Sequence, residues 1–375
     1  MRQWRILHSE SSLGWGGQEV RVLVELEWMR AHGHWVALAA HPESAIAKRA
    51  QDVGIAFVPL RTHKALLPFE IVRLTAWLIA NRIDLVNTHS SNDGWLAGIA
   101  ARLAFKTLIR SRHIEVDYPN KFWSGVAFRF MPRHVITTSQ VIANRLVEEL
   151  GVSPQRVSCI STGVDLTKFK VAADVPSADR PLADGGNLRE ELGLSPDVAL
   201  VGMISVLRSW KGHATFLAAA ADLLQSSKRS IRFVIAGDGP GRQELTDKIA
   251  QEPWKGQVTL LGHRADVPNV LASLDVLVLP SYAHEGIPQI ILQAQAMARA
   301  VVATTVGGIP EVVEDNVTGL LIPPRNPEAL AEKIATLLDD SALRARLGQA
   351  AREKIEKHHS VDAMGEKLLA LYGSL

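Results

Sequence analysis

The pattern of hydrophobic and polar positions alternates between two segment lengths along the chain. Short runs rich in β-branched and other apolar residues are separated by longer stretches whose apolar residues recur at helical spacing. In the first half, the runs that predict strands are Arg5–His8, Trp35–Ala40, Ala56–Leu60, Asp84–Thr88, Thr107–Arg110, His134–Thr138 and Val157–Ser161. The helical stretches between them include Gln18–Ala31, Glu70–Asn81 and Gln140–Leu150. Strand–helix–strand repetition with short connections predicts a parallel sheet that is covered on both faces.

The same alternation returns after a break at Val171–Asn187, which holds two Pro and two Gly and lacks apolar periodicity. The later strand runs are Val198–Ser205, Ile231–Ala236, Val258–Leu261, Val276–Leu279, Ala300–Thr304 and Gly319–Ile322, and helices include Ala214–Gln225, Gly241–Ile249 and Ile290–Ala298. We therefore expect the α/β class, with two doubly wound, Rossmann-like domains that face each other across a cleft. The expected boundaries are residues 1–170, a linker at 171–190, residues 191–357, and a C-terminal helix at 358–375 that could pack back on the first domain.

Length and composition agree with this expectation and exclude several classes of protein. A chain of 375 residues suggests two domains of about 150–200 residues each. Its 47% hydrophobic and 21% charged residues are typical of a globular chain and not of a disordered one. No apolar run reaches the roughly 20 residues of a membrane-spanning helix, and the first residues lack the pattern of a signal peptide. The single cysteine, Cys159, has no partner for an internal disulfide, and we expect it in a buried strand of a cytoplasmic protein.

The net charge of +2 hides an asymmetry between the two halves of the chain. Residues 1–165 hold 19 Lys and Arg against 14 Asp and Glu, and the rest of the chain holds 22 against 25. A basic first half favours an anionic acceptor or an anionic membrane surface, so we expect a cytoplasmic protein that is either free or peripheral on the inner face of the cell membrane. The alternative explanation of the charge asymmetry is chance together with ordinary solubility. The amphipathic stretch Arg61–Arg82 could likewise contact a membrane, and the alternative is a helix packed on its own sheet. The charges are scattered, so we expect no nucleic acid partner.

A glycine-rich turn, Gly14-Trp15-Gly16-Gly17, follows the first predicted strand and leads into a helix. Glycine has no side chain, so backbone N–H groups at such a helix N-terminus can approach a phosphate or a sugar. The turn matches neither the dinucleotide-binding fingerprint nor the Walker A motif. A structural tight turn is the alternative interpretation of Gly16 and Gly17.

Two cations follow the first strand of the second series. Arg208 and Lys211 stand between the predicted strand Val198–Ser205 and the next helix. A diphosphate leaving group gains negative charge as its bond to a sugar breaks, and cations in this place would neutralise it. Two solvated surface cations are the alternative.

The loops after the next two strands carry further candidates. Gly237 begins a glycine-rich turn that resembles a dinucleotide fingerprint only weakly, because Pro240 and the lack of a well-placed acid count against NAD. A simple glycine turn before a helix explains it equally well. His263 and Arg264 follow the next strand, where the loop backbone could contact a nucleobase.

The most specific segment is Pro280–Gln289, which precedes the predicted helix Ile290–Ala298. Glu285 lies in this loop directly after a strand, and either a helix cap or a solvated acid is the alternative to a functional role. The N–H groups around Gly286, Ile287 and Gln289 lead into the helix, where an anion or a sugar hydroxyl can bind, whereas Pro288 has no N–H to donate. Gln293 lies one turn further along and could point the same way. We find no His/Cys cluster and no Asp-x-Asp motif, so we expect no metal ion.

In this order and spacing, the motifs resemble the retaining glycosyltransferases of family 4, which have the GT-B fold. The resemblance covers essentially the whole chain. It rests on Gly16-Gly17-x-Glu19, Arg208-x-x-Lys211-Gly212, Gly237-Asp-Gly-Pro240, Gly262 with Asp266 and Asp275, Glu285-Gly-Ile-Pro288, Gly307-Gly-Ile-Pro-Glu311 and Gly319-Leu-Leu. Gly163-Val-Asp165 with Phe169 looks like the family's crossover between domains.

The resemblance implies a role for each matched residue. Arg208 and Lys211 would hold the diphosphate, Glu285 would contact hydroxyls of the donor sugar, and Gly17 would meet the donor phosphate. His113 is the best match to the family's histidine near the reacting sugar carbon, and His89 would line the acceptor side; a structural role is the alternative for both. The family usually carries a second Glu where this chain has Gln293, and an amide can still bond a ribose hydroxyl.

The implied reaction is metal-independent transfer, with retention, from a UDP- or GDP-linked sugar to a saccharide or glycolipid acceptor, as in lipopolysaccharide or polysaccharide assembly. The nucleotide sugar would be a co-substrate, so no cofactor is expected. A non-catalytic nucleotide-sugar binding protein is one alternative, motivated by Gln293. A sugar-nucleotide epimerase or a phosphorylase on a related fold is another.

Overall fold

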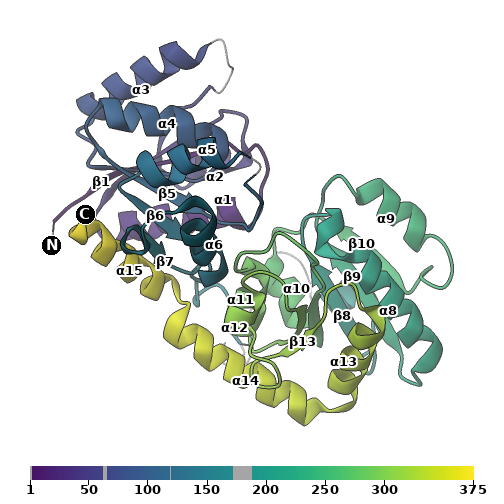
Figure 1. Cartoon of the computed structure of the whole chain (residues 1–375). Helices are drawn as coiled ribbons and strands as arrows, with labels where there is room; N and C mark the ends of the chain where they lie inside the picture. Colours follow the sequence, from purple (N-terminus) through teal and green to yellow (C-terminus); the bar gives the residue numbers. More distant parts are fainter. Residues whose placement is uncertain (1, 62–65, 119, 172–187) are drawn as a thin grey trace. The chain divides into compact units, whose positions relative to one another are not determined.

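The computed structural model describes residues 2–61, 66–118, 120–171 and 188–375. They divide into two compact units, Met1–Gly163 with Val361–Leu375 and Val164–Ser360 (Figure 1). Each unit contains one parallel sheet with helices on both faces, which confirms the expected α/β class with two Rossmann-like domains. Most of the predicted linker, residues 172–187, lies outside the described residues.

The sheet of the first unit has seven strands in the order β3-β2-β1-β4-β5-β6-β7. The strands are β1 (Arg5–Glu10), β2 (Trp35–Ala40), β3 (Ala56–Pro59), β4 (Leu85–Thr88), β5 (Thr107–Arg112), β6 (His134–Thr137) and β7 (Val157–Cys159). Every strand that the first half of the sequence predicts is present. The helices are α1 (Gly17–Ala31), α2 (Ala45–Asp52), α3 (Leu67–Ala80), α4 (Ser91–Leu103), α5 (Lys121–Gly125), α6 (Gln140–Leu150) and α15 (Val361–Ser374), with a π-helical turn at Val126–Phe130 and a 3₁₀ turn at Pro154–Arg156.

Both faces of this sheet are buried because successive strand residues point to opposite faces and helices cover each one. Ile6 packs in a core with residues of α1, α2 and α15, whereas its neighbour Leu7 packs in a second core with residues of α3 and α4. This explains why the strands read as continuous apolar runs.

The sheet of the second unit has six strands in the order β10-β9-β8-β11-β12-β13. The strands are β8 (Ala199–Ile204), β9 (Ile231–Ala236), β10 (Val258–Gly262), β11 (Val276–Leu279), β12 (Ala300–Thr304) and β13 (Leu320–Ile322). The helices are α7 (Leu188–Glu191), α8 (His213–Ser226), α9 (Arg242–Ile249), α10 (Val267–Ser273), α11 (Gln289–Ala296), α12 (Ile309–Val312), α13 (Pro327–Asp339) and α14 (Ser341–His358), with a 3₁₀ turn at Ser209–Lys211. Val201 packs in a core with residues of α8 and α13, and Leu200 in the opposite core with residues of α10 and α11.

The last helix of the chain, α15, belongs to the first unit and packs on α1. The indole Nε1 of Trp28 donates to Asp362 Oδ1 at 2.7 Å. Gly365 lies so close to the Trp28 ring that an added Cβ would be 2.3 Å from ring atom Cδ2. Glycine at this position therefore permits α15 to approach α1.

The expectation that Cys159 is buried is wrong. The residue lies in a strand, as predicted, but β7 is a three-residue strand at the edge of the sheet, and its cysteine is exposed. An apolar run in the sequence predicts a strand, whereas the position of that strand at the edge of the sheet depends on the strand order. Among the described residues, none of the helices is long and apolar enough to cross a membrane.

Candidate active site

The strand order of the second sheet reverses between β8 and β11. β9 and β10 lie on one side of this point, and β12 and β13 lie on the other. Open α/β sheets bind ligands beyond the carboxyl ends of their strands at such a point. The loops after β8 and β11 carry Arg208, Lys211 and Glu285, so all three residues come to the same edge of the sheet.

Lys211 and Glu285 form a largely buried ion pair at this edge. Lys211 Nζ donates to Glu285 Oε1 at 2.6 Å, and the Ser281 hydroxyl donates to the same oxygen at 2.6 Å. The side chains of Lys211 and Glu285 are 20% and 5% exposed. An ammonium group has three N–H donors, so this contact leaves donors for an anion. The pair offers a cation beside a carboxylate acceptor, which suits a ligand that carries both phosphate and hydroxyl groups.

Close packing of the two loops holds this pair in place. Gly212 has φ +83°, and an added Cβ would lie 2.0 Å from the carbonyl oxygen of Pro280. The N–H of Tyr282 donates to the carbonyl of Trp210 at 2.8 Å. Arg208 is exposed, and its guanidinium carbon lies 5.0 Å from the centroid of the Trp210 ring. The glycine after Lys211 is therefore needed for the loops after β8 and β11 to touch.

The loop after β12 also packs closely against the backbone of Glu285. Gly307 has φ +56°, and an added Cβ would lie 2.0 Å from the Glu285 carbonyl oxygen. Gly286, Ile287 and Pro288 are buried behind Glu285 and lead into α11 at Gln289, with the Ile287 side chain in the core. Gln293 is the fifth residue of α11 and is half-buried.

Two further predicted residues of this unit, Gly237 and Arg264, have structural partners. The N–H of Gly237 donates to the Gly262 carbonyl at 2.7 Å, and an added Cβ would lie 1.9 Å from the Ser205 carbonyl oxygen. Arg264 binds both carboxylate oxygens of Asp266 and pairs with Glu191, while His263 is exposed. These contacts give Gly237 and Arg264 a role in shaping the loops.

The glycine-rich turn of the first unit forms the N-terminus of α1. Gly16 is the N-cap residue, Gly17 is the first residue of the helix, and the N–H of Gly16 donates to Glu19 Oε2 at 2.8 Å. Glu19 of the Gly-Gly-x-Glu motif therefore holds the turn, as the acid of a capping box does. The predicted site residues fall into two groups, with Gly16, Gly17, His89 and His113 in the first unit and the others in the second.

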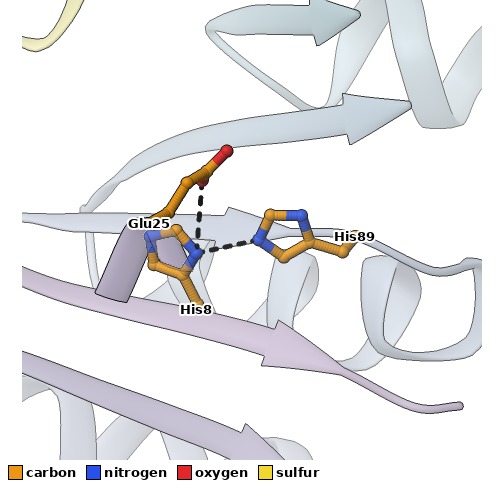
Figure 2. Close-up of side chains that lie close together, drawn as sticks. All are labelled: His8, Glu25 and His89. Carbon is orange, nitrogen blue, oxygen red and sulfur yellow. Dashed lines mark hydrogen bonds and ion pairs between the residues drawn. The ribbon is translucent and has the colours of Figure 1, made fainter. Parts of the chain in front are cut away.

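Three buried histidines form a continuous hydrogen-bonded row in the first unit. His113 Nε2 lies 2.8 Å from His89 Nδ1, and His89 Nε2 lies 2.9 Å from His8 Nδ1. The row ends at Glu25, whose Oε2 lies 3.8 Å from His8 Nδ1, as Figure 2 shows for His8, Glu25 and His89. Glu25 Oε1 accepts from Arg21 Nε at 2.6 Å.

Burial keeps these histidines neutral at pH 7. Desolvation lowers the pKa of His8 to about 4, and it holds the pKa values of His89 and His113 well below their usual value. Ligand atoms of His8, Glu25 and His89 lie within 4.8 Å of one another, which is close enough for a shared metal ion. His8 Nδ1 and His89 Nε2 are already hydrogen-bonded to each other, however, and the Arg21 guanidinium occupies one oxygen of Glu25. The cluster is better explained as a hydrogen-bonded row than as a metal site.

Two carboxylates lie buried at the carboxyl edge of the first sheet. Glu10 accepts from Gln18 Nε2 and the Ser12 N–H, and Asp93 accepts from the hydroxyls of Ser9 and Ser11. Burial, followed by the nearby charge of Asp93, raises the pKa of Glu10 to about 7. Burial also raises the pKa of Asp93.

Sequence reasoning identified His89 and His113 but missed His8, Glu25, Arg21 and Glu10. Arg21 and Glu25 are four residues apart on α1 and are both fully buried, at 1% exposure each. A charged pair at this spacing normally marks a solvent-facing side of a helix. Nothing local in the sequence distinguishes such a pair from a buried one.

Comparisons with known proteins agree with this geometry. The family described as "Glycosyltransferase Family 4" matches residues 15–168, and the one described as "Glycosyl transferases group 1" matches residues 185–354. The chain is 34% identical to an alpha-D-kanosaminyltransferase of Streptomyces kanamyceticus, over 49% of this chain and 48% of that protein. It is 28% identical to an Escherichia coli UDP-Gal:alpha-D-GlcNAc-diphosphoundecaprenol alpha-1,3-galactosyltransferase, over 80% of this chain and 78% of that protein. It superposes on an Anabaena protein solved with UDP and glucose with a TM-score of 0.86 and 21% identity, over 100% of both chains.

Proposed function

The chain belongs to glycosyltransferase family 4, and we propose that it transfers a sugar from a UDP- or GDP-linked donor to a saccharide or glycolipid acceptor. The observation that carries the proposal is the Lys211–Glu285 pair at the point where the strand order of the second sheet reverses. UDP is the first nucleotide to test, because a relative that is 28% identical is named for a UDP-galactose donor.

Each residue of this edge would have a distinct task. Lys211 and Arg208 would bind the diphosphate and stabilise the charge that grows on it during departure. Glu285 would accept hydrogen bonds from hydroxyls of the donor sugar. Gln293 would hold the nucleotide ribose through its amide.

We propose transfer with retention and without a metal ion. The bond between the anomeric carbon and the phosphate oxygen breaks, and the acceptor oxygen bonds that carbon on the same face. The acceptor proton passes to the departing phosphate oxygen, so no protein base has to take it. Two cations would neutralise the phosphate, which is the task that a metal would otherwise serve.

Gln293 and the exposed Arg208 also permit the second candidate, a protein that binds nucleotide sugars without turnover. Calorimetric titration with UDP, GDP and ADP tests the shared binding step. Proton NMR of the reaction with donor and a lipid-linked saccharide then tests transfer, since the coupling of the anomeric proton reports retention or inversion. Tight binding of one nucleotide without product from any acceptor would favour the second candidate, and no binding at all would overturn both.

The acceptor side is proposed to meet an anionic membrane surface, with the protein peripheral on the inner face of the membrane. Helix α3 exposes Phe69, Val72 and Ile79 at 67%, 65% and 56%. A separate cavity of about 720 Å³ in the first unit is lined by Arg102, Lys106 and Arg133 beside Phe105. Apolar side chains near basic ones are typical of peripheral membrane contact. Sedimentation with anionic and zwitterionic vesicles at low salt tests this, and equal failure to pellet with both would overturn it.

A further inference from the structure

The histidine row crosses the middle of the first sheet at its carboxyl end. His8 lies in β1, His89 follows β4 directly, and His113 follows β5 directly. These three strands are neighbours in the sheet, so side chains at their ends can meet across it. His8, His89 and His113 are 0%, 4% and 7% exposed. Hydrogen bonds link His8 to His113 through His89, and Glu25 Oε2 lies 3.8 Å from His8 Nδ1.

A row of neutral histidines can run in only two directions. Each neutral ring carries one N–H donor and one acceptor nitrogen. If His8 carries its proton on Nδ1, it donates to His89 Nε2, His89 Nδ1 donates to His113 Nε2, and His113 must carry its own proton on Nδ1. If His8 Nδ1 is instead the acceptor, every proton moves to Nε2 and His113 Nδ1 becomes an acceptor.

Glu25 favours the first direction. The Nδ1 nitrogen of His8 hydrogen-bonds to His89 Nε2, and the negative charge of Glu25 Oε2, 3.8 Å away, favours the form in which Nδ1 carries the proton. Arg21 holds the other oxygen and keeps the carboxylate in place. Among the described residues, neither Glu25 Oε2 nor His113 Nδ1 has a hydrogen-bond partner in the protein. One end of the row therefore has a fixed carboxylate oxygen, and the other end has a buried nitrogen without a partner in the protein.

We propose that Glu25 is a positioning residue that sets the tautomers of His8, His89 and His113, so that His113 carries its proton on Nδ1 and can donate it to a sugar substrate. This inference rests on the proposed function, because the resemblance to glycosyltransferase family 4 implies that His113 lies near the reacting sugar carbon. His8 and His89 transmit the preference, and neither needs to touch the substrate. With an N–H at Nδ1, His113 acts as a hydrogen-bond donor, so the sugar oxygen that it meets has to accept.

Glu25→Gln reverses the row with almost no change of shape. The Gln oxygen must take the place of Oε1, because Arg21 Nε can only donate. Its NH₂ group then takes the place of Oε2 and faces His8 Nδ1 as a donor. His8 Nδ1 becomes an acceptor, and His113 is expected to carry its proton on Nε2. Glu27→Gln, a half-buried position on the same helix, is the matched control.

Long-range ¹H–¹⁵N NMR of histidine-labelled protein reads these tautomers directly, with His113→Gln assigning the signals. We expect His113 as the Nδ1–H form in the wild type and in Glu27→Gln, and as the Nε2–H form in Glu25→Gln. An Nε2–H form in the wild type overturns the proposal, and this measurement needs no substrate.

Transfer kinetics test the consequence. Losing one oriented donor at a transition state lowers kcat by roughly 10²–10³-fold in oxyanion sites, so we expect a fall in kcat of at least about tenfold in Glu25→Gln. Affinity for UDP is expected to stay unchanged, because Lys211 and Glu285 are untouched. Reversed tautomers with an unchanged kcat would overturn the positioning role while leaving the proposed function intact. Loss of UDP binding in the wild type would instead count against the proposed function.

Discussion

Replacing Lys211 by Ala separates the two tasks of this residue, which are to neutralise Glu285 and to bind a diphosphate. In the structure, the ammonium is held 2.6 Å from Glu285 Oε1. The substitution removes the cation but leaves a carboxylate that is 5% exposed and that accepts a hydrogen bond from the Ser281 hydroxyl. Both stability and nucleotide affinity should therefore fall.

The magnitudes follow from burial and charge. Breaking a fully buried ion pair costs about 3–5 kcal/mol, and because Lys211 is 20% exposed we expect about 2 kcal/mol less stability. A hydrogen bond to a charged group contributes about 1.5–3 kcal/mol, so affinity for UDP should fall roughly 10- to 150-fold. The double variant Lys211→Ala/Glu285→Gln removes the unpaired charge, so it should recover stability without recovering affinity.

Urea unfolding and calorimetric titration with UDP measure the two effects separately. Lys228→Ala is the control, because Lys228 is exposed and lies in the turn before β9, at the opposite end of the strands. If Lys211→Ala binds UDP as tightly as the Lys228→Ala control, Lys211 does not bind the diphosphate. If the double variant recovers affinity as well as stability, the loss in the single variant came from a distorted loop and not from a missing cation.

Three further substitutions test the packing and the buried charges. Gly307→Ala should weaken UDP binding and lower stability, because its Cβ would displace the Glu285 backbone. The control Gly256→Ala has a similar φ of +71° but open space around the added Cβ, so it should change only stability. Equal UDP affinities of the two variants would contradict this reasoning. Gly365→Ala should cost about 1–3 kcal/mol by overpacking against Trp28, measured by thermal unfolding against Gly373→Ala, which meets nothing within 4 Å. The folded-state pKa of Glu10 is about 7, above its ordinary value of 4.5, so its contribution to stability is present below about pH 4.5 and is lost as pH rises through 7. Glu10→Gln should therefore gain stability relative to wild type between pH 5 and pH 8, by up to about 3 kcal/mol in urea unfolding, and a constant difference across this range would refute the argument.

Local patterns predicted most of the fold. The thirteen strands of the two sheets lie where short apolar runs predict them, because a strand buried on both faces needs apolar residues at consecutive positions. The sequence also identified Gly212, which follows Lys211 in the motif Arg208-x-x-Lys211-Gly212. The family resemblance, and with it the class of reaction, rested on the order of such motifs.

Pairing between distant residues was decided only by the tertiary structure. Lys211 meets Glu285 because β8 and β11 are neighbours in a sheet whose order differs from the order of the chain. Cys159 is exposed because β7 became an edge, and α15 joined the first unit because Gly365 leaves room for Trp28. His8, Glu25 and Arg21 escaped sequence reasoning for the same reason. Hydrophobic periodicity records which face of an element is buried, but the partners that a buried charged group meets depend on which strands and helices become neighbours.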